Sequence, residues 1–229
     1  MTTPLLGVVI PTLNEAEPLP HLLGDVAQLG ITTDVVVADG GSTDATVDTA
    51  RRYGARVITS PRGRGAQLRA GAEAVRGDWL CVLHADVRMP EPARGELHRA
   101  IDAAVDAAVW RLAIDAHGVW PRVMEWGARV RDRIGGLPYG DQGLLVRRTV
   151  YEAVGGFPEI PLMEDVALIR ALRSSVHVER LAAPLLVSPR RWLREGPYRT
   201  WLRNSVLITA YHVGVPPKRL ARWYRPETT

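Results

Sequence analysis

Residues 35–44 read Val35-Val36-Val37-Ala38-Asp39-Gly40-Gly41-Ser42-Thr43-Asp44, an apolar run that stops at an acid and two glycines. Such a continuous β-branched run is typical of a strand covered on both faces of a sheet. The glycines permit backbone angles that other residues avoid, and the hydroxyls that follow can accept from the free N–H groups of a helix. The stretch predicts a buried strand that delivers a binding loop, although Asp-Gly-Gly-Ser turns also occur without a function.

Three further apolar runs alternate with helical patterns through the first 86 residues. This alternation predicts an α/β fold with a mainly parallel central sheet flanked by helices. The expected strands are 5–10, 34–38, 55–59, 79–83 and 107–114, and the expected helices are 19–29, 47–54, 66–76, 90–105 and 119–134. We find no repeat and no linker, and therefore expect residues 1–229 to form one domain with two halves, 1–86 and 87–189, and a C-terminal helical segment, 190–229.

The helix expected at 119–134 carries an apolar stripe. Its members recur at helical spacing: Val119, Val123, Trp126, Val130 and Ile134. A stripe of this kind usually faces the core, so we expect these side chains to be buried rather than to line a ligand site.

Hydrophobic residues make up 46% of the chain and charged residues 24%, as in soluble globular proteins. The single cysteine, Cys81, lies in an apolar run and is expected to be a buried small hydrophobe without a disulfide partner. Because the N-terminus lacks a basic signal region and no apolar run approaches the roughly 18–20 residues that span a bilayer, we expect a cytoplasmic protein.

The C-terminal segment is strongly basic. Residues 190–225 contain eight Arg and one Lys against a single acid, Glu195, and the arginines are interleaved with Trp and Tyr. Peripheral contact with an anionic membrane is one interpretation, a phosphorylated substrate is another, and packing of the aromatic side chains onto the core is a third. No recognised nucleic-acid motif accompanies the arginines, so a nucleic-acid partner is not expected.

Acids follow three of the expected strands: Glu15, Asp39 and Asp86. The carboxyl ends of parallel strands share one edge of the sheet, where ligands of open α/β folds bind. Carboxylates at that edge repel a bare phosphate, but they are useful where a divalent cation neutralises the phosphate or where a base or ribose donates hydrogen bonds to them.

Motifs spread over most of the chain resemble, in their joint order, those of family 2 glycosyltransferases of GT-A fold. The segments are Ile10-Pro11-Thr12-Leu13-Asn14-Glu15, Asp39-Gly40-Gly41-Ser42-Thr43-Asp44, Gly65 to Gly71, His84-Ala85-Asp86, Gly155-Gly156-Phe157, Glu164-Asp165 and Arg191-Trp192. Histidine at the first acid of the D-x-D motif makes the chain similar to the compact branch labelled radical-SAM/selenodomain-associated transferases. The resemblance implies that 1–86 is a nucleotide-sugar-binding half and that 87–189 is an acceptor and catalytic half.

The resemblance also implies a donor site. It places around the nucleotide Pro11, Thr12, Asn14, Glu15 and Asp39, with Asp39 against the base, and beside the diphosphate Arg62, Arg64, Gly65 and Arg69. Carboxylates accept from uracil or ribose and arginines suit phosphate, so the chemistry agrees. Two alternatives remain: Asn14 and Glu15 start the first helix, and the arginines are solvated surface residues.

Asp86 is then the expected ligand of Mn²⁺ or Mg²⁺, which bridges to the donor diphosphate. His84 and Ala85 complete the motif. His84 meets the ribose, binds the metal through its imidazole, or only fills space; an imidazole ligand favours Mn²⁺.

For catalysis the resemblance assigns Asp165 as the base, with Glu164 as its partner in the Glu-Asp pair, both at a helix N-terminus. Simple helix capping is the alternative. On the acceptor side it places Asp141 and Gln142, with Arg191 toward the diphosphate and Trp192 toward the acceptor. Because Ser188 replaces the glutamine of the processive Q-x-x-R-W motif, polymer synthesis is disfavoured.

We therefore expect a metal-dependent, inverting glycosyltransferase that moves a sugar from a nucleotide-diphosphate sugar, UDP favoured over GDP, to an unknown small or lipid-linked acceptor. The alternatives are a sugar nucleotidyltransferase, whose usual glycine-rich N-terminal signature is missing, and a non-catalytic module that binds nucleotide sugar or a membrane surface. A dehydrogenase is disfavoured because Leu68 replaces the third glycine of the dinucleotide fingerprint.

Overall fold

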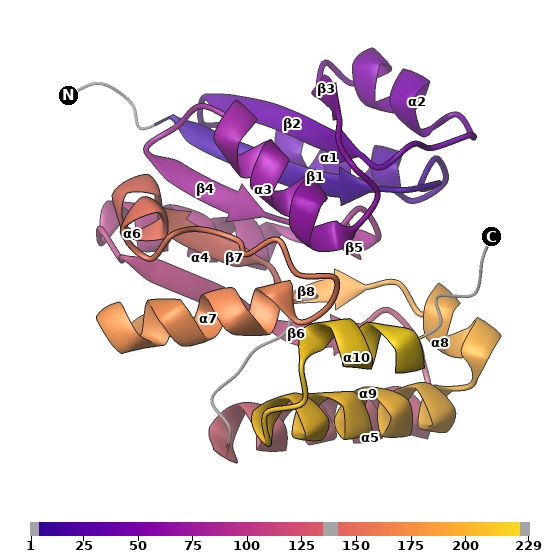
Figure 1. Cartoon of the computed structure of the whole chain (residues 1–229). Helices are drawn as coiled ribbons and strands as arrows, with labels where there is room; N and C mark the ends of the chain where they lie inside the picture. Colours follow the sequence, from indigo (N-terminus) through magenta and orange to yellow (C-terminus); the bar gives the residue numbers. More distant parts are fainter. Residues whose placement is uncertain (1–4, 135–141, 225–229) are drawn as a thin grey trace.

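A computed structural model describes residues 5–134 and 142–224 of the chain (Figure 1). Its strands are β1 (Leu6–Thr12), β2 (Thr33–Asp39), β3 (Arg56–Thr59), β4 (Trp79–Val82), β5 (Val87–Arg88), β6 (Ala107–Ile114), β7 (Leu144–Arg147) and β8 (Val178–Val187). Its helices are α1 (Leu19–Ala27), α2 (Thr46–Arg52), α3 (Arg64–Ala74), α4 (Glu91–Asp102), α5 (Val119–Ile134), α6 (Arg148–Ala153), α7 (Glu164–Ser175), α8 (Arg190–Glu195), α9 (Pro197–His212) and α10 (Pro217–Trp223).

The strands of the described residues form one sheet in the order β3-β2-β1-β4-β7-β6-β8-β5. Strands β1 to β4 are parallel to one another, with Ile10 opposite Val37, as the alternation of strands and helices predicts. Strand β7 inserts antiparallel between β4 and β6, and β5 is antiparallel to β8. The α/β class and the mainly parallel sheet are confirmed, while the antiparallel strands of the second half were not predicted.

Helices cover both faces of the sheet. Alternate residues of β1 enter two separate hydrophobic clusters, since successive side chains of a strand point to opposite faces. Val8 and Ile10 pack with α1 and α4 on one face, whereas Val9 packs with α3 and α7 on the other. The sheet is therefore a middle layer between helices. The carboxyl ends of its parallel strands are not covered by these helices but continue into loops.

Strand β1 runs two residues further than the apolar pattern predicts, through Pro11 and Thr12. Strand β2 extends alongside it, so that Thr12 lies opposite Asp39. On the other side β4 pairs only as far as Val9, whose carbonyl accepts from the Leu83 N–H at 3.0 Å. Pro11 therefore faces a side where the neighbouring strand has ended, and its missing N–H costs no ladder bond.

Helix α5 has the predicted bounds, but the prediction that its apolar stripe is core was wrong for Val119, Val123 and Trp126. Val130 is half-buried, and the side chain of Ile134 lies outside the described residues. Val119 is 75% exposed and Trp126 is 61% exposed, whereas Met124 and Ala128 are buried. In Figure 1, α5 lies with α9 along the lower side of the molecule, and α5 contacts the sheet at the end of β6, where the Ile114 N–H donates to Glu125. Periodicity identifies an apolar side of a helix, but it does not say whether another element covers that side.

No helix among the described residues is long and apolar enough to cross a membrane. The C-terminal part of the chain, from Arg190 to Trp223, forms α8, α9 and α10, as its helical patterning predicts.

Gln67 ties α3 to the carboxyl edge of the sheet. Its buried amide nitrogen donates to the carbonyls of Thr12 at 2.6 Å and Ala38 at 3.0 Å, the ends of β1 and β2. A side chain at Gly40 would come within 3.0 Å of this amide, so Gly40 leaves room for it. The sequence analysis missed Gln67; its position one helical turn before Gly71, on the side of α3 that packs on β1, is the signal that would have identified it.

Replacing Gln67 with Met keeps the length of the side chain but leaves two buried carbonyls without their donor. We expect Gln67→Met to lower the free energy of unfolding by about 1–3 kcal/mol. Urea denaturation measures this change. The exposed Gln28 provides a matched control, since Gln28→Met should stay within about 0.5 kcal/mol of the unmutated protein. Equal effects of the two substitutions would contradict the role of the Gln67 amide.

Burial raises the pKa of the Cys81 thiol from 9.0 to about 12. The native protein then keeps this proton in a pH range where the unfolded chain releases it, so this thiol makes the free energy of unfolding fall as pH rises above about 9. We expect Cys81 to be unreactive toward a disulfide reagent at pH 8 in the native state and to react fully in denaturant. Equal labelling rates in both states would contradict its burial.

Candidate functional site

The loop after β2 is organised around the buried carboxylate of Asp39. One oxygen accepts from the backbone N–H groups of Gly41 and Ser42, both at 2.9 Å. The other accepts from the hydroxyls of Ser42 and, at 3.1 Å, of Thr12 on β1. Gly41 has φ of 93°, which favours glycine. Asp39 thus holds its own loop closed, and its predicted contact with a nucleoside base requires one of these donors to be exchanged for the base.

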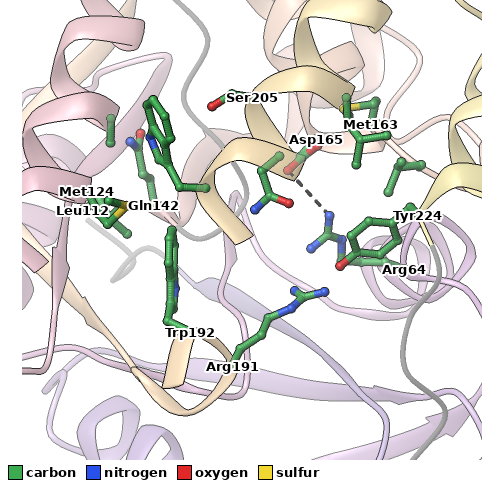
Figure 2. A pocket seen from close by; sticks show the side chains of 15 residues that line it. Arg64, Leu112, Met124, Gln142, Met163, Asp165, Arg191, Trp192, Ser205 and Tyr224 are labelled. Carbon is green, nitrogen blue, oxygen red and sulfur yellow. Dashed lines mark ion pairs between the residues drawn. The ribbon is translucent and has the colours of Figure 1, made fainter. Parts of the chain in front are cut away.

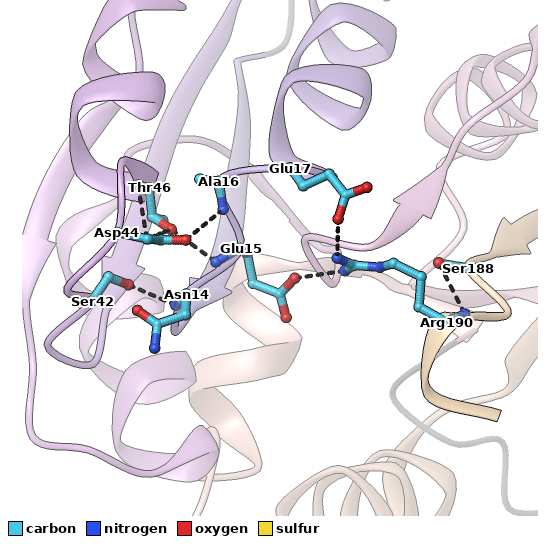
Figure 3. A network of polar contacts seen from close by, with 9 residues as sticks. All are labelled: Asn14, Glu15, Ala16, Glu17, Ser42, Asp44, Thr46, Ser188 and Arg190. Carbon is cyan, nitrogen blue, oxygen red and sulfur yellow. Dashed lines mark hydrogen bonds and ion pairs between the residues drawn. The ribbon is translucent and has the colours of Figure 1, made fainter. Parts of the chain in front are cut away.

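A second set of bonds joins the loops after β1 and β2 (Figure 3). Asn14 donates its backbone N–H to the Ser42 hydroxyl and accepts from the Thr43 N–H through its side-chain oxygen, both at 2.9 Å. The Glu15 N–H donates to the Thr46 hydroxyl at 2.8 Å. Helix α1 begins at Leu19 without a side-chain cap, and the Glu15 carbonyl accepts from the Leu19 N–H at 3.1 Å. Asn14 and Glu15 also fix the two loops to each other.

Glu15 turns its carboxylate toward the C-terminal half. The Arg190 guanidinium donates to Glu15 at 2.9 Å and to Glu17 at 3.1 Å (Figure 3). Burial raises the pKa of Glu15, although the guanidinium of Arg190 opposes the rise. The start of α8 is thereby attached to the loop after β1.

The segment His84-Ala85-Asp86 follows β4 in a tight turn. The Val87 N–H donates to the His84 carbonyl at 3.3 Å, and the Ser188 N–H donates to the Asp86 carbonyl at 3.0 Å. Ala85 is buried, while His84 and Asp86 are half-buried. The predicted metal ligands therefore lie beside β1 on the same edge of the sheet as the loops of Asn14 and Asp39.

The side chains of this turn are suited to bind a metal ion that a substrate also ligates. No group of three or more His, Cys, Asp or Glu side chains able to hold a metal occurs in residues 5–134 and 142–224. Mg²⁺ and similar ions commonly bind through one or two protein groups together with substrate phosphates. Asp86 and His84 fit such a shared ion, and they do not make a self-sufficient cage.

Arg64, the first residue of α3, connects this helix to the two acids at the start of α7. Its guanidinium forms an ion pair with the buried Glu164 and lies 3.9 Å from Asp165. The pKa of Glu164 is raised by burial and by the neighbouring Asp165, whereas Arg64 acts to lower it. Gly65, the next residue of α3, lets the segment before α7 come close to α3, because a Cβ atom there would lie 2.8 Å from the Ile160 carbonyl oxygen.

Glu164 and Asp165 occupy the first turn of α7, after Met163 in the left-handed region at φ of 68°. Asp165 accepts from the adjacent Val166 N–H at 2.8 Å. Glu164 is directed to Arg64, so the two acids differ in their surroundings. Only Asp165 lines the cavity described next.

A cavity of about 100 Å³ opens beside Asp165 (Figure 2). The predicted residues that line it are Arg64, Gln142, Asp165, Arg191 and Trp192. Residues that the sequence analysis missed also line it: Leu112, Met124, Ala128, Leu162, Met163, Trp201, Asn204, Ser205, Leu207 and Tyr224. Its wall is thus polar near Asp165 and largely apolar along α5 and α9.

The remaining predicted residues lie elsewhere. Arg62 is exposed. Arg69 is turned toward Glu73, at 3.1 Å, and the Phe157 carbonyl, at 3.3 Å. Asp141 lies outside the described residues.

Aromatic contacts position Arg191 and Trp192, the two cavity residues that belong to α8. The Arg191 guanidinium lies 5.5 Å from the centre of the Tyr224 ring, which extends from the end of α10. The ring centres of Trp192 and Trp120, which belongs to α5, lie 6.3 Å apart. The cavity wall is therefore assembled from helices that are distant in sequence, which is why the motifs did not reveal all of it.

Known proteins resemble this chain in sequence. The family model of Glycosyl transferase family 2 matches residues 7–142, more than half of the chain. An uncharacterized glycosyltransferase of Mycobacterium tuberculosis is 34% identical over 135 residues, 56% of this chain and 61% of its own. A PGL/p-HBAD biosynthesis glycosyltransferase of the same species is 36% identical over 94 residues, 38% of this chain and 37% of its own. The chain spans less than two thirds of the length of these relatives.

Solved structures resemble it in fold. A mannosyltransferase from Pyrobaculum calidifontis, solved with GDP-Man and Mn²⁺, has a TM-score of 0.64 at 20% identity, covering 95% of this chain and 67% of that one. Glucosyl-3-phosphoglycerate synthase from Mycobacterium tuberculosis, solved with Mn²⁺, UDP and glucosyl-3-phosphoglycerate, has a TM-score of 0.62 at 18% identity, covering 93% and 81%. Together with the family match over residues 7–142, these likenesses establish that the chain belongs to glycosyl transferase family 2 and has a GT-A-like fold.

Proposed function

We propose that the chain is a metal-dependent, inverting glycosyltransferase that takes a sugar from a nucleotide-diphosphate sugar, with UDP favoured over GDP. The observation that carries the proposal is the cavity, which brings Asp165, Arg64 and Arg191 together although they come from three separate motifs. Two proteins of similar fold are solved with Mn²⁺ and a nucleotide or nucleotide sugar, GDP-Man in one and UDP in the other. The finer placement in the radical-SAM/selenodomain-associated branch rests on His84 alone and stays a prediction.

The donor nucleoside occupies the edge formed by the loops after β1 and β2. The hydrogen bonds among Asn14, Asp39 and Ser42 hold this edge in place before the donor arrives. A carboxylate at Asp39 accepts from the imide N–H of uracil when the Ser42 hydroxyl turns away. Preorganisation of this kind reduces the entropic cost of binding.

The diphosphate lies between the turn of Asp86 and the arginines of the cavity. Asp86, with His84, would hold a divalent ion there, and the imidazole favours Mn²⁺ over Mg²⁺. When bound, this ion neutralises the charge that develops on the departing nucleotide diphosphate. Arg64 and Arg191 add two planar guanidinium groups that suit phosphate oxygens.

Asp165 removes the proton from the acceptor hydroxyl. As the proton moves to the carboxylate, the hydroxyl oxygen forms a bond to the anomeric carbon. The bond from that carbon to the diphosphate oxygen breaks, and its electron pair leaves with the nucleotide diphosphate. Glu164 keeps Arg64 in place through their ion pair and is too buried to meet an acceptor. This single displacement inverts the configuration of the anomeric carbon, because the acceptor oxygen attacks the face opposite the departing diphosphate.

The acceptor enters the cavity from the side of α5 and α9, where Gln142 and Trp192 meet it. The acceptor is a small or a lipid-linked molecule that carries a hydroxyl group. The other two functions considered above predict different products. Pyrophosphate release from a sugar 1-phosphate and a nucleoside triphosphate would support a nucleotidyltransferase, and donor binding without transfer to any acceptor would support a binding module.

Asp165→Asn should abolish transfer while donor binding persists, because the amide cannot accept the proton yet keeps the size of the side chain. We expect the rate of sugar transfer or donor hydrolysis to fall about 10²–10⁴-fold. Calorimetry with the UDP-sugar should give a Kd within a few-fold of the original. Glu91, an exposed acid in the first turn of α4, is a matched control, and Glu91→Gln should leave both values unchanged. Full turnover in Asp165→Asn would remove Asp165 from the role of base.

Asp86→Asn should remove the dependence of donor binding on Mn²⁺. In the unmutated protein we expect Mn²⁺ to tighten UDP binding at least tenfold, about 1.4 kcal/mol, and UDP to bind more tightly than GDP. Titration calorimetry with and without Mn²⁺ measures both differences. The exposed Asp102 serves as control in Asp102→Asn. A response to Mn²⁺ that survives in Asp86→Asn would place the ion elsewhere, and failure to bind either nucleotide with Mn²⁺ or Mg²⁺ would overturn the proposed function.

A further inference from the structure

The outer sides of α5 and α9 expose large apolar side chains. On α5 these are Val119, Val123 and Trp126, and on α9 and its C-terminal end they are Tyr198, Leu202, Val206 and Val213. Their exposed fractions include 75% for Val119, 61% for Tyr198 and 59% for Leu202. We name this set the α5/α9 face. Single exposed apolar residues are ordinary on a protein surface, whereas a contiguous group marks an interaction site.

The two apolar rows are neighbours. Tyr198, Leu202 and Val206 follow one another at four-residue spacing, which aligns them along one side of α9. Helices α5 and α9 lie side by side (Figure 1), and a side chain at Gly127 would come within 3.1 Å of the indole nitrogen of Trp201. Trp126 and Leu202, the sequence neighbours of Gly127 and Trp201, are 61% and 59% exposed, so the two rows approach each other at this contact.

The charge around this face is positive. Exposed arginines accompany the apolar rows: Arg122 and Arg129 on α5, Arg194 on α8 and Arg199 on α9. In the described part of α8, α9 and α10 the one acid is Glu195, whose side chain is 8% exposed. Its carboxylate forms ion pairs with the guanidinium groups of Arg203, at 2.6 Å, and Arg191, at 3.4 Å. The geometry of the Arg203 pair is not that of a hydrogen bond.

On α5 the described acidic side chain, Glu125, is half-buried and accepts from the Ile114 N–H at 2.8 Å. Arginines around this face thus have no exposed acidic neighbour on the described side chains of α5, α8, α9 and α10.

We propose that the α5/α9 face docks onto an anionic phospholipid surface. Apolar and aromatic side chains that lie among arginines have the composition of helices that lie in the membrane interface. Anionic headgroups attract basic side chains that lie near a membrane surface, and the exposed arginines around this face are such side chains. Two adjacent helices present convex sides, which a deformable bilayer accommodates without a matching groove.

The structure narrows which aromatic residues take part. Of the aromatic side chains in the basic C-terminal segment, Trp192 lines the cavity, Tyr211 lies 5.3 Å from the Arg170 guanidinium, and Tyr224 contacts the Arg203 guanidinium at 5.0 Å. These three are used within the protein. Contact with the membrane runs through α9 and, unexpectedly from the sequence, through α5, rather than through the whole of 190–225.

The docking face is the outside of the cavity wall. Met124 and Ala128 of α5, with Trp201 and Leu207 of α9, line the cavity beside Asp165 from within. An acceptor held in the membrane would thus reach Asp165 between the same two helices. This consequence rests on the proposed transferase function, whereas docking itself does not.

Vesicle sedimentation tests the proposal. The full chain should sediment with vesicles of phosphatidylcholine and phosphatidylglycerol at least tenfold more than with phosphatidylcholine alone, and less as salt increases. The double variant Leu202→Ser with Val206→Ser should lose at least tenfold of this binding. Tyr53, an exposed aromatic residue at the end of α2, provides a matched control in Tyr53→Ser, which should bind as the unmutated protein does.

UDP binding with Mn²⁺, measured in parallel, separates the two proposals. The double variant should bind UDP unchanged, which shows that it is folded. If the unmutated protein binds UDP but does not sediment with anionic vesicles, the docking proposal is overturned, whereas the proposed function is not affected. Self-association without vesicles that disappears in the double variant would also overturn it, because a second copy would then cover the α5/α9 face.

Discussion

The buried carboxylate of Asp39 is the constraint on which the edge formed by the loops after β1 and β2 depends. A carboxylate that is 4% exposed is stable only when hydrogen-bond donors replace the water it has lost. Its donors come from β1, through Thr12, and from the loop that follows, through Gly41 and Ser42. The ends of β1 and β2 are consequently held at one spacing.

Two arginines connect this edge to the rest of the domain. Arg64 reaches from α3 to the buried Glu164, and Arg190 reaches from α8 back to Glu15. Glu164 and Glu15 are both withdrawn from solvent, and an unpaired charge there would be destabilising. Each ion pair therefore helps to fix the start of a helix, α3 for Arg64 and α8 for Arg190. The first pair joins the start of α3 to the start of α7, where Asp165 lies. The second attaches the start of α8 to the loop after β1, and the next two residues of α8, Arg191 and Trp192, line the cavity.

Much of the fold follows from local patterns. Apolar runs bounded by glycine and acids located β1 to β4, and β6 and α5 have the bounds that the sequence predicts. The errors have a common cause. The stripe of α5 was interpreted as core because periodicity reveals an apolar side, but α5 packs beside α9 with Val119 and Trp126 left in solvent. Gln67 was missed because a buried glutamine is informative only once its partners, the carbonyls of Thr12 and Ala38, are known.

The sequence by itself determined the α/β class, the acids at the strand ends and the family, because these depend on residue types at short spacing along the chain. Only the tertiary structure decided which of those residues meet. Asp165, Arg64 and Arg191 line one cavity, whereas Glu15 turns to Arg190 and Arg69 turns to Glu73. The physical reason is that contacts between distant segments are set by how helices pack on the sheet, and packing depends on the whole set of buried surfaces rather than on any single motif.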